Sequence, residues 1–81
     1  MHTLIDINHT ENGYSQLANA IVLQAVKDYR NALERLIKHP HNSMALSAKQ
    51  EVERFFHSNW FTILTNIDPE MLIQKLNAEV A

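Results

Sequence analysis

Residues 15–38, SQLANAIVLQAVKDYRNALERLIK, decide the fold, because neither glycine nor proline interrupts them. At 100° per residue on a helix, the apolar residues of this stretch fall on one continuous arc. The arc is wider than the ~100° stripe of an ordinary surface helix, so this helix is predicted to contact two neighbouring elements. Ser15 is its predicted N-cap. The arc consists of Leu17, Ile21, Val22, Ala25, Val26, Tyr29, Ala32, Leu33, Leu36 and Ile37.

A second helix is predicted to follow a short turn. Pro40 disfavours helical geometry at His39 and so ends the first helix. The next periodic stretch begins at Asn42 or Ser43 and runs to about residue 57. Two antiparallel helices joined by a short loop form an αα-hairpin. The predicted apolar face of the second helix consists of Met44, Ala48, Val52, Phe55 and Phe56.

Two shorter helices are predicted to complete the chain. An i, i+3, i+4, i+7 spacing of Trp60, Ile63, Leu64 and Ile67 indicates a short third helix. Asp68, Pro69 and Glu70 then supply an N-cap acceptor, a proline at the first helical position and an acidic first turn. The last helix is predicted to span residues 69–79, with buried Leu72, Ile73, Leu76 and Val80.

The predicted fold class is therefore all-α, a small bundle of three to four helices. A long central helix packs in an αα-hairpin with the second helix, and the two shorter helices lie C-terminal to them. At 81 residues, 46% of them hydrophobic, the chain suits one domain with a rich core. Residues 1–14, which include the turn signal Asn12-Gly13, are predicted to be a flexible arm, and residues 15–81 the single domain.

Composition argues against several classes of protein. The chain has no cysteine, so disulfides and thiolate metal sites are excluded. No apolar run reaches the roughly 18–20 residues of a membrane span, and no signal-peptide pattern opens the sequence. We therefore expect a cytoplasmic protein with no membrane partner. The formal net charge of −2 provides no general attraction for nucleic acid.

No catalytic apparatus is recognisable, and the chain is predicted not to be an enzyme and to have no catalytic residues and no cofactor. A single glycine rules out a glycine-rich phosphate loop, and no serine lies in a G-x-S-x-G setting. Glu51 and Glu53 point in different directions on a helix. A metal site at His39, His41 and His57 is a less favoured alternative to solvated histidines, because further ligands are lacking.

Four aromatic residues, Phe55, Phe56, Trp60 and Phe61, follow helical spacing across the second and third helices. They could stack on nucleic-acid bases, but a place in the core is the simpler interpretation. The indole N–H of Trp60 needs a partner, so an edge position is expected for this residue.

The polar face of the long helix is the candidate partner-binding region. Leu23 is a large apolar residue at its edge, and an exposed leucine beside an arginine suits a protein partner. The basic residues suit phosphate contact. Glu34, four residues from both Arg30 and Lys38, instead favours a solvated face with ordinary ion pairs. The candidate site residues are Leu23, Lys27, Arg30, Lys38 and Arg54.

Two stretches carry a resemblance, residues 18–36 (ANAIVLQAVKDYRNALERL) and residues 51–76 (EVERFFHSNWFTILTNIDPEMLIQKL). They resemble small all-helical proteins encoded by phages and integrated mobile elements of Gram-positive bacteria. In that family a glycine commonly follows the aspartate, whereas this chain has Pro69. The family has no assigned reaction or site. The resemblance implies a cytoplasmic accessory protein that binds machinery of the host or of the element.

Two functional hypotheses follow. The first is a non-enzymatic protein-binding module that inhibits or modulates a host system such as CRISPR defence. The alternative is a small nucleic-acid-binding or regulatory protein that uses the basic face of the long helix. In addition, the long helix carries more apolar surface than two short helices can cover, so a homodimer that hides the remainder is a further expectation.

Overall fold

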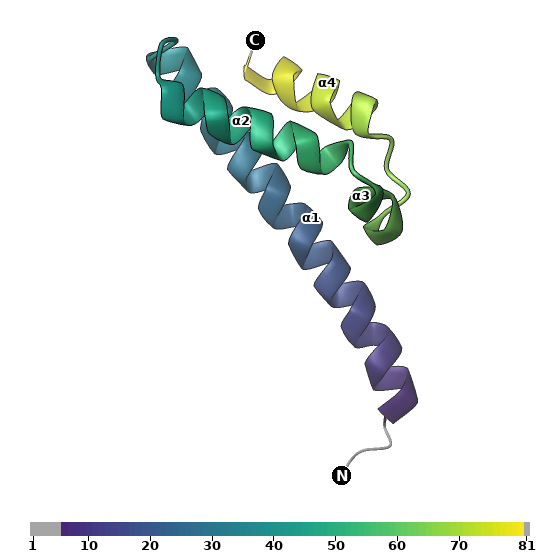
Figure 1. Ribbon diagram of the computed structural model, residues 1–81. Coiled ribbons are helices and arrows are strands. Elements are labelled where there is room, and N and C mark those ends of the chain that lie inside the picture. The colour runs from purple at the N-terminus through teal and green to yellow at the C-terminus, as the bar shows by residue number, and fades with distance from the viewer. Residues whose placement is uncertain (1–5, 81) are drawn as a thin grey trace.

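A computed structural model describes the backbone of residues 6–80 and the side chains of residues 13–80. Within that range the chain forms four helices and no strand: α1 (Asp6–Lys38), α2 (Ser43–Phe56), α3 (Asn59–Leu64) and α4 (Pro69–Val80). Figure 1 shows α2 folded back along the C-terminal half of α1, with α4 beside them and α3 near the middle of α1. The predicted small all-α bundle is confirmed.

The α1–α2 hairpin forms where the sequence predicts it. The amide of His39 still bonds the carbonyl of Arg35, and the chain then turns through Pro40. Asn42 caps α2, because its side-chain oxygen accepts a 3.1 Å hydrogen bond from the amide of Ala45. Such a cap satisfies one of the free amides that every helix start leaves.

The start of α1 differs from the prediction. The helix begins at Asp6, so Ser15 lies inside it and is not an N-cap. One glycine costs a helix only about 1 kcal/mol relative to alanine, and Gly13 therefore does not interrupt α1. Residues 1–5 of the predicted arm lie outside the described residues.

Every helix contributes to one core. Phe56 lies at its centre, with its ring centroid 5.3 Å from that of Phe61 and 5.7 Å from that of Tyr29. These distances and the tilted or edge-on ring orientations are those that aromatic pairs prefer. The core cluster consists of Val22, Tyr29, Leu33, Phe56, Phe61 and Leu76, with Leu72, Ile73 and Val80 of α4 packed against it as predicted.

The predicted inner face of α2 is wrong at Met44, whereas Val52, Phe55 and Phe56 lie in or against the core as predicted. Met44 is 77% exposed, whereas Ala45 is fully buried. Since Phe56 is the fully buried aromatic of α2, the positions four, seven and eleven residues before it share its face, and Ala45 is the last of these. The prediction extended this face to Met44, which lies about 120° from Phe56 around the helix.

The apolar spacing that predicted α3 does not coincide with the buried face of that helix. Trp60 and Ile63 are exposed, whereas Phe61 is fully buried and Leu64 is half-buried. Ile67 lies beyond the end of α3 and is exposed. Of the four aromatics, Phe55, Phe56 and Phe61 pack in or against the core, and Trp60 is 65% exposed, in line with the edge position expected for it.

A polar network joins three helices around Tyr29. Its hydroxyl donates a 2.6 Å hydrogen bond to Oε2 of Glu53 on α2 and accepts a 3.0 Å hydrogen bond from Nδ2 of Asn77 on α4. Nζ of Lys49 donates to the same Glu53 oxygen at 2.8 Å. Burial, followed by the bond to Glu53, raises the pKa of Tyr29 to about 12. Burial alone would raise the pKa of Glu53, but the bonds from Lys49 and Tyr29 outweigh it and lower that pKa.

We expect Tyr29→Phe to lower the free energy of unfolding by about 1 kcal/mol, the usual contribution of one hydrogen bond. The loss is small because Lys49 still bonds Glu53 and Asn77 still bonds the carbonyl of Ile73. Urea denaturation measures the change. Tyr14→Phe is the matched control, since Tyr14 is exposed, and it should leave stability unaltered. An equal loss in both variants would contradict the network.

A second polar contact holds the start of α4 against the end of α2. His57 Nε2 lies 2.5 Å from Oε2 of Glu70, and its Nδ1 lies 2.9 Å from the carbonyl oxygen of Glu53. A protonated imidazole donates both hydrogen bonds. The bond to Glu70, then that to the Glu53 carbonyl, raises the pKa of His57.

This contact predicts a pH-dependent stability. Because the pKa of His57 is raised in the folded chain, its stabilising effect is complete below the unfolded value of about 6.5 and is lost as pH rises through the folded value. The melting temperature of the wild type should therefore exceed that of His57→Gln at pH 5.5, and the difference should shrink by pH 8.5. Glu70→Gln should flatten the dependence. A difference that grows with pH would contradict the assignment.

Candidate protein-binding surface

Five large apolar side chains are exposed side by side where α1 passes α3. We call them the α1–α3 surface: Tyr14 (70% exposed), Leu17 (58%) and Ile21 (39%) of α1, and Trp60 (65%) and Ile63 (73%) of α3. All five line one groove of about 620 Å³, together with Ala18 and Leu64. Contiguous apolar patches beyond a few hundred Å² are rare on monomeric soluble proteins and mark interaction sites.

The relative lengths of the helices leave the α1 part of this surface uncovered. At 1.5 Å per residue, the 33 residues of α1 span roughly 50 Å and the 14 residues of α2 roughly 21 Å. Figure 1 shows the N-terminal half of α1 extending past the other three helices. The apolar arc therefore continues along α1 beyond the last helix that could bury it.

The packing of α3 against the core exposes the α3 part of the α1–α3 surface. Ser58 caps α3 by accepting a hydrogen bond from the amide of Phe61, and Phe61 packs edge-on against Phe55 and Phe56. Residues three apart share a helix face, so Leu64 lies on the same side of α3 as Phe61 and faces the core. Trp60 and Ile63 therefore lie on the opposite side.

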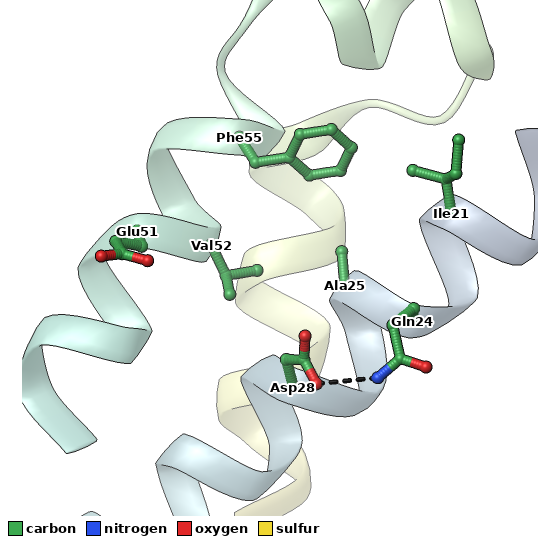
Figure 2. A pocket seen from close by; sticks show the side chains of 7 residues that line it. All are labelled: Ile21, Gln24, Ala25, Asp28, Glu51, Val52 and Phe55. Carbon is green, nitrogen blue, oxygen red and sulfur yellow. Dashed lines mark hydrogen bonds between the residues drawn. The ribbon is translucent and has the colours of Figure 1, made fainter. Parts of the chain in front are cut away.

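A second groove adjoins the first at Ile21. It lies between α1 and α2, has a volume of about 350 Å³, and has an apolar floor that includes Ala25, Val52 and Phe55. Figure 2 shows Ile21 and Phe55 at one end of it, and Gln24 hydrogen-bonded to Asp28 at the other. Ile21 lines both grooves, so apolar surface continues from α3 to the middle of α2.

The predicted site residues lie at separate places on the molecule. Leu23 is 66% exposed, in agreement with its predicted place at the edge of the polar face of α1. Lys27 and Arg30 line one shallow depression together with Asp28 and Glu34. Lys38 lines another at the α1–α2 turn, with His39 and His41. Arg54 belongs to the last turn of α2.

Arg30 is held by an acidic partner from another helix. Its Nε and Nη2 atoms donate bidentate hydrogen bonds of 2.8 and 2.9 Å to the carboxylate of Glu79 on α4. These bonds raise the pKa of Arg30 and lower that of Glu79. The expectation that Arg30 would pair with Glu34 is therefore wrong. The basic face of α1 thus carries a neutralised Arg30 and two acidic neighbours.

The described histidines do not converge. His57 bonds Glu70, whereas His39 and His41 lie at the α1–α2 turn. Among residues 13–80, no three His, Cys, Asp or Glu side chains are grouped as a metal site requires.

Comparison of the chain with protein families, with curated proteins and with solved structures finds no match. None of the helices in the described part of the chain has the length and apolar character needed to cross a membrane.

Sequence reasoning missed the α1–α3 surface as a site, and it placed Tyr14, one of the five residues, in the predicted flexible arm. It assigned Leu17 and Ile21 to the apolar arc, Trp60 to an edge position and Ile63 to the apolar spacing of the third helix. The signal that pointed to the surface was the width of the arc, which exceeds what short helices can cover.

Proposed function

We propose that this chain is a non-enzymatic protein-binding module whose docking site is the α1–α3 surface. The observation that carries the proposal is the joint exposure of Leu17, Trp60 and Ile63 in one groove. Tryptophan and tyrosine are enriched among the residues that dominate binding energy, and both occur here. A helix of a partner chain fits a groove between two helices through side chains spaced three and four residues apart.

The proposed setting is an accessory role for a phage or integrated mobile element, in the cytoplasm of a Gram-positive host. It is supported by the resemblance of residues 18–36 and 51–76 to small helical proteins of such elements. A binding module of this size acts by occupying a surface of a larger complex, and a host defence system such as CRISPR is one such target. Leu23 is exposed on another side of α1 and lies outside the proposed docking site.

Nucleic-acid binding by the basic face of α1 remains the alternative, and the pairing of Arg30 with Glu79 weighs against it. Lys27 and Lys38 are left among Asp28 and Glu34, on a chain whose formal net charge is −2. Binding carried by phosphate contacts falls steeply with salt. A salt-dependent mobility shift of duplex DNA that Lys27→Ala abolishes would favour the alternative.

Affinity capture tests the proposal. The tagged chain is exposed to a lysate of cells that also produce the untagged chain, so that every class of protein partner is present, a second copy included. We expect the wild type and Leu23→Glu to retain the same bound protein and Leu17→Glu to lose it. Leu23 is a matched control because it is a leucine of the same helix with similar exposure. If the Leu17→Glu variant retains the same bound protein as the wild type, the proposal is wrong.

A further inference from the structure

We propose that the occupant of the α1–α3 surface is a second copy of this chain, docked about a two-fold axis through the N-terminal half of its α1. This inference rests on the proposed function, since it names the partner of the same surface. Four features of the chain support it: the spacing of the exposed side chains, the absence of charge, the presence of both halves of the contact in one copy, and the exposed area.

The exposed residues of α1 have the spacing of a helix–helix seam. Tyr14, Leu17 and Ile21 follow each other at intervals of three and four residues, which places them in one strip along α1. The same alternation of three and four is the apolar repeat by which helices pack in coiled coils. A helix is therefore the element that this strip fits.

The stretch that carries the strip has no charged side chain. From Asn12 to Val26 the sequence contains no Asp, Glu, Lys, Arg or His. Two copies can lie antiparallel along this stretch without bringing like charges together, which would otherwise disfavour self-pairing. A partner selected by charge would find nothing to recognise here, whereas a second copy offers an equally neutral apolar helix.

One copy carries both halves of the contact. The α1 strip of one chain can enter the groove that Trp60 and Ile63 form beside α1 of the other, and the two-fold axis repeats the contact in reverse. Such an isologous interface is closed, so it covers both apolar sets and leaves none to recruit further copies. It would cover the part of α1 that extends past the other helices of its own chain (Figure 1).

The exposed area suits a weak to moderate dimer. Side chains of this size, exposed by 39–73%, present on the order of several hundred Å² per copy. Standard interfaces bury about 800 Å² per partner, so the contact falls at or below that size. We expect dissociation in the micromolar range, within reach of dilution experiments.

Trp60 is the only tryptophan, so it reports directly on this contact. Sedimentation equilibrium of the full chain at about 200 µM should give twice the chain mass of 9.4 kDa. Dilution toward 1 µM should shift the Trp60 emission maximum to longer wavelength as the indole returns to water. Leu17→Glu and Ile63→Glu should each weaken association at least about tenfold. Leu23→Glu should leave it unchanged, and circular dichroism should show all variants equally helical.

Five outcomes would overturn the inference. A chain of single mass at 200 µM, an emission maximum that is independent of concentration, or a dimer that Leu17→Glu leaves intact would each contradict the proposed contact. A monomer whose capture of a different protein still depends on Leu17 would refute the second copy while supporting the proposed function. A monomer with no Leu17-dependent capture would overturn both.

Discussion

Phe56→Ala should lower the free energy of unfolding by about 3–5 kcal/mol, the usual cost of removing a buried phenylalanine ring. Phe56 is fully buried and its ring contacts those of Tyr29, Phe55 and Phe61, so the cavity would open where α1, α2 and α3 meet. The free energy of unfolding of an 81-residue domain is only about 4–12 kcal/mol. The melting temperature should fall by at least about 12 °C.

Met44→Ala is the matched control on the same helix. Met44 is 77% exposed, so its truncation should change stability by no more than about 0.5 kcal/mol. Phe56→Ala and Met44→Ala together distinguish the structure from the sequence pattern. The pattern assigns both residues to the inner face of α2, whereas only Phe56 is buried in the structure. Comparable losses in the two variants, measured by thermal and urea denaturation, would contradict the observed burial of Phe56 and exposure of Met44.

Leu76→Ala should cost about 2–5 kcal/mol, because Leu76 is the fully buried residue through which α4 enters the core. Leu72, Ile73 and Val80 of α4 are only half-buried, Met71 is exposed, and the polar links of α4 to α1 are few. We expect amide protection across Pro69–Val80 to fall first, before that of α2. Hydrogen exchange followed by mass spectrometry measures this.

Met71→Ala is the control for α4. Met71 is 67% exposed and belongs to the same helix, so the substitution should leave both the melting temperature and the exchange of α4 close to those of the wild type. Loss of α4 protection in Met71→Ala, or its retention in Leu76→Ala, would show that α4 is held by other contacts.

Local signals accounted for most of the helix boundaries. Asn42 and the Asp68-Pro69-Glu70 start are capping patterns that act over a few residues, and α2 and α4 begin where these patterns predict. The amide of Glu70 accordingly donates a 2.9 Å hydrogen bond to Oδ1 of Asp68. The start of α1 was misjudged because a turn signal around Gly13 is a weak preference that a long helix overrides.

The orientation of α3 depends on contacts that are distant in sequence. In a six-residue helix, the pairs Trp60/Ile63 and Phe61/Leu64 are equally apolar and equally spaced, so periodicity does not choose between them. The choice is made by Phe61, which packs on Phe56. Similarly, Arg30 pairs with Glu79, which is 49 residues away in the sequence, and not with Glu34, the acidic residue at helical spacing from it.

The candidate site was predictable only in part. Exposure of Leu23 followed from its position outside the apolar arc, and the excess width of that arc indicated uncovered surface on the long helix. The predicted hairpin returns α2 along the C-terminal half of α1 and leaves the N-terminal end of the arc uncovered. The sequence did not show that α3 exposes Trp60 and Ile63 beside that end.

Site-specific photo-cross-linking in producing cells tests the central claim most directly, namely that the α1–α3 surface is covered by another protein chain. A benzophenone amino acid is placed at position 17 and, for comparison, at the exposed position of Gln50 on α2. We expect irradiation to give a discrete covalent adduct from position 17 and none from position 50. The claim would be contradicted if irradiation gave no adduct from position 17, or if positions 17 and 50 gave equal adducts.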